Sequence, residues 1–402
     1  MVSDTQHTVF AQIREEEIAQ ILTDLVRIPT VNPPGDVREA VRYCADILHH
    51  AGFSLHIVAH DEAKPNLVAR YRWGKGPTLL FNAHLDVVPI GEEASWTHPP
   101  FGADYVDGRI YGRGANDDKA SVAAQLVAAL ALVRSQVPLA GELVVTTVAD
   151  EEIGGQDGTA FLIEQATLQP DFVIVGEPTD NRVCIGERGG TGIIITTYGR
   201  TAHGALPWEG VNAIEGMAFV IMALRERLWP VLAQRRAPYF TAPSSATISI
   251  IHGGVKTNVV PDQCSITIDR RLIPGETPQE AIAEVRAIAE EAVAAMPGIR
   301  VSVAPAYEWL GREATLQPLD SPLVQTMLEV NRQLGLESTP TGFNMATDGR
   351  FFAARGFPTI IYGPGDPATA HKPDEWVALA DVVMAAKAYA LATLRLLHPC
   401  EG

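Results

Sequence analysis

A histidine and a carboxylate close an apolar segment near residue 80. His84 and Asp86 are two residues apart at the end of segment 78–86, so we expect both side chains to leave the same face of a strand. A carboxylate beside a histidine is common around metal ligands, because it fixes the ring tautomer and raises the basicity of the ring. The pair therefore indicates a metal ligand and its orienting acid. A hydrogen-bonded histidine at a strand end is the alternative.

Other acidic residues and a second histidine fall where elements are expected to begin or end. Asp117 precedes a helical pattern, where it would otherwise be an N-terminal cap. The adjacent acids Glu151 and Glu152 follow an apolar segment, and such a pair is costly unless a cation or solvent compensates it. Glu177 ends another apolar segment, and His371 follows a glycine turn. Together with His84, these residues offer the nitrogen and oxygen ligands that suit zinc, cobalt or manganese.

Signatures of several other enzyme classes are absent from the sequence. It contains no H-E-x-x-H, no G-x-S-x-G, no G-x-x-x-x-G-K-[ST] and no complete G-x-G-x-x-G before a helix. These absences argue against simple zincins, serine hydrolases, P-loop proteins and dinucleotide-binding proteins. A metal site built from scattered acids and histidines remains.

Alternating helical and strand patterns must position these side chains, and they predict an α/β fold. Open α/β sheets place their ligands beyond the carboxyl ends of the strands, which is where the acids of this chain collect. We expect buried strands at 78–86, 142–150, 171–177 and 358–362, and helices at 14–28, 37–51, 118–134, 321–335 and 376–397.

The middle of the chain has a different pattern. The β-rich segments 190–199, 246–254 and 264–272 alternate with helical patterns at 211–228 and 278–296, and segment 300–305 follows. This order resembles a small α+β sandwich. We therefore predict two domains: a mixed-sheet domain formed by residues 1–187 and 305–402, and an inserted domain at 188–304.

The overall composition limits the possible partners. The chain has 402 residues, which favours more than one domain, and a net charge of −17. An acidic surface repels phosphate backbones and anionic lipid, so we expect no nucleic-acid or membrane partner. The four cysteines form no C-x-x-C pair, and the N-terminal residues show no secretory pattern. We expect reduced thiols in a cytoplasmic protein.

At this point the motifs resemble those of the M20 family of metallopeptidases and amidohydrolases, nearest to its acetylornithine deacetylase and succinyl-diaminopimelate desuccinylase branch. The resemblance covers nearly the whole chain, in matching order and spacing. It rests on AHLDVVP (83–89), WTHPPF (96–101), DGRIYGRGANDDK (107–119), DEEIGG (150–155), VGEPT (175–179), RTAHGALPWEGVNAI (200–214), TNVVPD (257–262), DRRLIPGET (269–277), TDGRFFA (347–353) and GPG…AHKPDEW (363–376).

The resemblance implies a zinc-peptidase-like catalytic domain that holds two divalent ions per chain, zinc or else cobalt or manganese. His84 would bind one ion, His371 the other, and Asp117 both. Glu152 and Glu177 would take one ion each, in an order that the sequence leaves open. Asp86 would orient His84, and Glu151 would be the general acid/base. The resemblance also implies a cis peptide between Asp117 and the next residue.

The inserted domain would act as a lid and as a dimerisation domain. By the same resemblance, His203 stabilises the oxyanion of the reaction, in its own or in a partner's site; an ordinary surface histidine is the alternative. Arg271, with Asn258 and Arg350, would bind a substrate carboxylate, because a guanidinium fork matches that group. The alternatives are ion pairs of Arg271 with Asp269 and of Arg350 with Asp348.

These expectations combine into an enzyme that hydrolyses the amide bond of N-acylated amino acids, as a homodimer. Two ions about 3.5–4 Å apart would acidify water and polarise the carbonyl, and a free carboxylate would move the proton. A dipeptidase or carboxypeptidase of the same family is the first alternative. A non-catalytic scaffold is the second, and the complete set of site residues argues against it.

Overall fold

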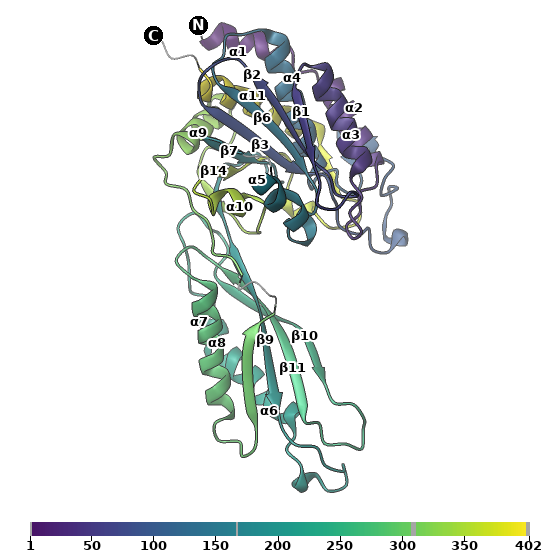
Figure 1. Cartoon of the computed structure of the whole chain (residues 1–402), viewed down its shortest axis with the longest axis vertical. Coiled ribbons are helices and arrows are strands. Elements are labelled where there is room, and N and C mark those ends of the chain that lie inside the picture. The colour runs from purple at the N-terminus through teal and green to yellow at the C-terminus, as the bar shows by residue number, and fades with distance from the viewer. Residues whose placement is uncertain (1, 166–167, 307–310, 399–402) are drawn as a thin grey trace. The chain divides into compact units, whose positions relative to one another are not determined.

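The computed structural model describes residues 2–165, 168–306 and 311–398, and these residues form two compact units (Figure 1). The first unit comprises Met1–Gly186, Gln317–Thr341 and Thr347–Gly402, and the second comprises Glu187–Leu316 and Gly342–Ala346.

The second unit runs past residue 304, where the predicted insert ends. The strand β12 (Arg300–Pro305) is followed by a return segment that pairs with the start of the unit. Gly190 and Arg312 exchange backbone hydrogen bonds of 2.9 Å, and the Thr315 amide donates to the Glu187 carbonyl at 3.0 Å. These contacts tie the return segment to the insert, and sequence periodicity gives no sign of them because the segment has no regular pattern.

An eight-stranded mixed sheet forms the centre of the first unit and confirms the predicted α/β class. The strand β3 is buried almost throughout and pairs in parallel with β6 and β7. Since parallel strands end at the same edge, the residues that follow these three strands meet there. In sheet order the strands are β1 (Ser54–Val58), β2 (Asn66–Arg72), β6 (Glu142–Val148), β3 (Thr78–His84), β7 (Phe172–Val175), β14 (Thr359–Ile361), β8 (Cys184–Glu187) and β13 (Thr341–Phe343).

Helices cover this sheet. The helix α4 (Lys119–Ser135) is buried along nearly its whole length, because it packs between the sheet and other helices, as its continuous apolar sequence predicts. Its neighbour α2 is more amphipathic, and its neighbour α11 lies near the C-terminal end of the chain. The remaining helices of this unit are α1 (Val2–Phe10), α2 (Glu15–Arg27), α3 (Arg38–His50), α5 (Phe161–Gln165), α9 (Pro322–Leu334), α10 (Gly349–Ala353) and α11 (Leu379–Leu396).

A small three-stranded sheet corrects one predicted boundary. Helix 376–397 was expected, but Trp376–Ala378 is the strand β15, which pairs with β5 (Arg109–Tyr111) beside β4 (Asp104–Val106). Tertiary pairing of these residues with β5 overrides their helical pattern. The pairing also brings the segment that follows His371 against the segment that precedes Asp117.

The second unit has a four-stranded antiparallel sheet in the order β10, β11, β9, β12. Residues of β11 alternate between buried and partly exposed, because helices cover one face of the sheet. The strand β10 lies at the edge. The elements are β9 (Gly189–Tyr198), β10 (Ser245–Gly253), β11 (Gln263–Leu272) and β12, with the helices α6 (Ala213–Arg227), α7 (Trp229–Leu232) and α8 (Pro278–Val293).

Two further expectations concern the cysteines and membrane-spanning helices. Cys44, Cys184 and Cys264 are buried free thiols, and Cys400 lies outside the described residues. Of the helices in the described ranges, none combines the length and the apolar character that a bilayer crossing requires.

Candidate metal centre

Asp117 lies between the two histidines of the predicted set. Its Oδ1 is 3.1 Å from Nε2 of His84, and its Oδ2 is 3.3 Å from Nε2 of His371. The side chain of Asp118, the next residue, accepts no capping hydrogen bond from α4. Helix capping therefore does not explain the adjacent pair Asp117 and Asp118. The peptide between the two aspartates is cis. One carboxylate that faces two imidazoles through different oxygens has the arrangement of a bridging ligand.

Glu152 joins the same cluster from the turn after β6. Its Oε2 is 3.3 Å from Nε2 of His371, and its Oε1 is buried without a hydrogen-bond partner among the described residues. Ligand atoms of His84, Asp117 and Glu152 all lie within 4.8 Å of one another. A buried carboxylate oxygen without a donor, beside such atoms, fits a cation better than any group that the chain itself supplies.

Glu177 reaches the cluster from the end of β7 and is only 6% exposed. Burial raises its pKa well above the usual range, and the nearby charges of Asp117 and Glu151 raise it further. Glu177 therefore interacts electrostatically with the other acids, although it lies outside the group of ligand atoms formed by His84, Asp117 and Glu152.

The balance of charge at this edge of the sheet is negative. Burial raises the pKa of Glu152 to about 7. Hydrogen bonds to Asp117 and Glu152 raise the pKa of His371 to about 10. Burial alone would lower the pKa of His84, but its contacts with Asp117 and Asp86 raise it well above the usual value. Without a metal, Arg350 compensates part of the charge of Glu151, and the other acids are neutralised by protons, either their own or those of the histidines. A divalent cation would remove that need.

Asp86 lies against His84 and also contacts the turn after β6. Nδ1 of His84 lies 2.9 Å from the Asp86 backbone carbonyl oxygen and 3.7 Å from the carboxylate, so the backbone makes the closer orienting contact. The Asp86 carboxylate also accepts hydrogen bonds from the backbone N–H groups of Glu151 and Glu152, at 3.1 and 3.2 Å. It thereby holds the turn that carries both glutamates.

Asn32 was missed by the sequence reasoning. Its Nδ2 donates to Oδ2 of Asp86 at 2.8 Å, inside the first unit, and its side chain is 1% exposed. A polar residue directly before the Pro33–Pro34 pair was the available signal, since such a segment adopts a restricted conformation. Asn32 completes the support of the Asp86 carboxylate.

Arg350 is held by backbone carbonyl groups inside the first unit. It donates to the carbonyl oxygens of Thr347, at 2.7 Å, and Gly154, at 3.1 Å. The Oε1 of Glu151 is 3.7 Å from Nη1, and Oδ1 of Asp348 is 3.9 Å from Nη2. Arg350 is 8% exposed and lies beside Glu151, so it can hold that carboxylate in place. Its contact with a substrate stays a prediction.

Three predicted residues lie in the second unit. His203 and Asn258 are exposed and come from neighbouring loops, because His203 bridges to Val259 and the Gly204 amide donates to the Asn258 carbonyl at 2.8 Å. Arg271 forms an ion pair of 3.0 Å with Asp269, which is the alternative considered above, and 42% of its side chain remains exposed.

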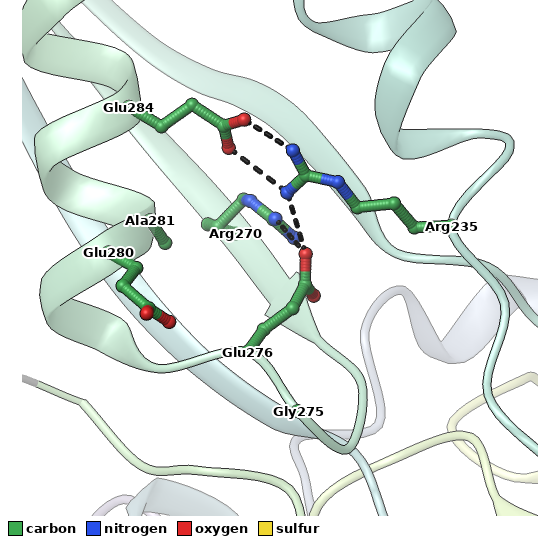
Figure 2. Close-up of a pocket in the computed structure, with 7 residues that line it drawn as sticks. All are labelled: Arg235, Arg270, Gly275, Glu276, Glu280, Ala281 and Glu284. Carbon is green, nitrogen blue, oxygen red and sulfur yellow. Dashed lines mark hydrogen bonds and ion pairs between the residues drawn. The ribbon is translucent and has the colours of Figure 1, made fainter.

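A surface cavity of about 480 Å³ lies beside Arg270 in the second unit (Figure 2). Figure 2 shows Arg270 and Arg235 pointing toward Glu276, and both arginines form ion pairs with it, at 2.7 and 2.9 Å. Arg235 also pairs with Glu284. Because the charges of this cluster satisfy one another, we interpret it as a structural ion-pair network. It links α8, the loop that carries Arg235 and the end of β11.

Comparison with known proteins agrees with this geometry. A model of "Peptidase family M20/M25/M40" matches residues 80–395. A succinyl-diaminopimelate desuccinylase of Cereibacter sphaeroides is 32% identical over 371 residues, which are 90% of this chain and 94% of the relative. Another, from Hydrogenovibrio crunogenus, is 29% identical and covers 95% of this chain and 99% of its own.

Solved structures share the fold at lower identity. A tripeptidase from Staphylococcus aureus superposes with a TM-score of 0.77, at 22% identity, over 96% of this chain and 99% of its own. A dinuclear metal-binding peptidase of the M20 family from Bacillus subtilis superposes with a TM-score of 0.69, at 17% identity, over 95% and 98%. At these identities the likeness establishes the architecture.

Proposed function

The chain belongs to peptidase family M20/M25/M40 and is a hydrolase of amide bonds, and we propose that it acts on N-acylated amino acids at a two-metal centre. The observation that carries the proposal is the placement of Asp117, which presents one carboxylate oxygen to His84 and the other to His371. Glu152 beside His371 favours binding of one ion by these two residues, and leaves His84 and Glu177 for the other. The ligand types suit zinc, cobalt or manganese.

When bound, the ions would lower the pKa of water and polarise the scissile carbonyl. Glu151 then takes the proton of the attacking water and delivers it to the leaving nitrogen. Its position supports this role, because Asp86 holds its backbone amide and Arg350 lies 3.7 Å from its carboxylate. Burial raises the pKa of Glu151, which favours proton uptake. His203 would donate a hydrogen bond to the oxyanion.

The substrate class is proposed from the relatives. The desuccinylases, at 29–37% identity, are nearer in sequence than the peptidases among the solved structures, at 15–22%. This difference favours a deacylase over a dipeptidase or carboxypeptidase. A screen of the metal-loaded protein against N-acetyl, N-succinyl and N-carbamoyl amino acids and dipeptides tests the choice. A cytoplasmic location is part of the proposal, since Cys44, Cys184 and Cys264 are free thiols.

Exchange of Glu151 for glutamine tests the acid/base role. We expect Glu151→Gln to keep its metal content and to lose roughly 10²–10⁴-fold in kcat, because the amide cannot accept the proton of water. Glu152→Gln is the matched control, since it removes one charge at the neighbouring position and should lose metal affinity first. Metal analysis and steady-state kinetics on the best substrate of the screen measure both effects. Turnover of Glu151→Gln within a few-fold of wild type would contradict the role.

Arg271 is the proposed contact for the substrate carboxylate, with Asn258 beside the His203 loop as an additional donor. Part of the Arg271 side chain is exposed, but its ion pair with Asp269 must be shared or released when a carboxylate binds. We expect Arg271→Ala to lose roughly 2–5 kcal/mol in kcat/KM at unchanged metal content, by analogy with truncated charge pairs.

A substrate amidated at that carboxylate separates this role from a structural one. Wild type should turn it over poorly, and Arg271→Ala should lose little further on it. If wild type hydrolyses the amidated and free forms equally well, no carboxylate clamp exists.

We further propose that the second unit forms a homodimer through β10 and α6. The strand β10 is a sheet edge that exposes Ile250 and Ile251, at 47% and 56%. Phe219 and Met222 of α6 are 57% and 51% exposed. A second copy would pair the free edge and cover these side chains.

Exchange of Ile251 for lysine tests the dimer, because the charge would be buried in the interface. We expect wild type to sediment as a dimer and Ile251→Lys as a monomer, measured by analytical ultracentrifugation. Ser302→Lys, an exposed position of β12 at the opposite edge of the sheet, is the control and should sediment as the wild type does. If His203 acts in the partner's site, mixed dimers of one His203→Ala subunit and one Glu151→Gln subunit should regain activity. One of their two sites then combines an intact Glu151 with an intact His203. A fully active wild-type monomer would refute that arrangement.

A further inference from the structure

Glu375 binds the loop that carries Asp117. It lies directly before β15 and is 1% exposed. Its Oε1 accepts three backbone N–H groups at 3.0 Å each, from Gly114, Asn116 and Asp117 itself. Three donors on one carboxylate oxygen form an anion-binding nest, and they leave little freedom to the backbone between them.

Arg113 completes this contact from the other side of the carboxylate. It is 2% exposed and donates through Nη1 to Oε2 of Glu375. The same nitrogen donates to the carbonyl oxygen of Lys372, next to His371, at 3.2 Å. The Gly112 amide also donates to the Glu375 carbonyl, at 2.8 Å. Glu375 and Arg113 therefore join the segment that carries His371 to the segment that carries Asp117.

The loop itself needs an external anchor. Gly114 has a φ of +84°, and a Cβ there would lie 2.6 Å from Cγ1 of Val87, so the chain turns tightly where side chains are excluded. No regular element runs between β5 and α4, and the amides of Gly114, Asn116 and Asp117 converge on Glu375. Removal of the carboxylate would leave these buried amides without their acceptor.

We propose that Glu375 is a positioning residue for the metal centre: its carboxylate sets the place of Asp117 relative to His371. The inference rests on the proposed metal-dependent function and adds a residue that contacts neither the ions nor the substrate. A buried ion pair that serves stability alone is the competing explanation. Glu142 provides that comparison within this chain, because it is 7% exposed and pairs with Arg70 and Arg72 at the opposite end of β6.

Exchange of Glu375 for glutamine in the full-length protein tests the proposal. A glutamine amide can present its oxygen to the three N–H groups or to Arg113, but its NH₂ group then faces the other donors. We expect Zn²⁺ binding, measured by competition with a chromophoric chelator, to weaken about 10–100-fold, as for other residues that support metal ligands. The absorption spectrum of the Co²⁺-loaded variant should also change, because Asp117 would shift relative to the ions.

Glu142→Gln is the matched control and should bind Zn²⁺ as wild type does, with the same Co²⁺ spectrum. Wild-type affinity and spectrum in Glu375→Gln would overturn the proposal, as would an equal loss of affinity in both variants. If Glu375→Gln does not fold, Glu375→Asp is judged by the same criteria, since its shorter side chain keeps the charge but cannot reach both sets of donors. Failure of wild type to bind Zn²⁺ would instead refute the proposed function.

Discussion

Repulsion among buried carboxylates is the constraint on which this site depends. The parallel strands β3, β6 and β7 end at one edge of the sheet, and the residues beyond them bring Glu151, Glu152 and Glu177 near Asp117. Burial raises the cost of each negative charge, and proximity raises it further. His84 and His371 compensate only part of the charge. The fold therefore creates a place that favours divalent cations, and the proposed chemistry follows from that preference.

A second set of side chains keeps these ligands in place. Asp86 binds the amides of the turn that carries Glu151 and Glu152, and Asn32 supports Asp86. Glu375 does the same for the loop that carries Asp117. In both cases a carboxylate binds backbone N–H groups, so the position of a ligand is set by the backbone beside it. Rigid support of this kind is what a two-ion site needs, because the distance between ligands fixes the distance between ions.

Much of this could be predicted from the sequence. Strong periodicity located the longer helices, the central strands of the large sheet and the strands of the second unit to within a few residues, but it did not locate β1, β2, β8 and β13 of the large sheet. Acids at the ends of buried strands indicated the candidate ligands. The motif resemblance assigned roles that spacing alone left open. The backbone contacts made by Asp86 and Arg350 could not be predicted, because they depend on which backbone groups turn toward each side chain. The strand at Trp376–Ala378 and the return segment near Arg312 depend on long-range pairing, which local patterns do not record.

A crystal structure of the Zn²⁺-loaded protein, with anomalous diffraction data collected above and below the zinc edge, tests the two-metal centre. We expect two zinc peaks, one on each side of the Asp117 carboxylate, with Glu152 and His371 at one and His84 and Glu177 at the other. A single peak, or zinc bound away from Asp117 at full occupancy, would contradict the two-metal centre.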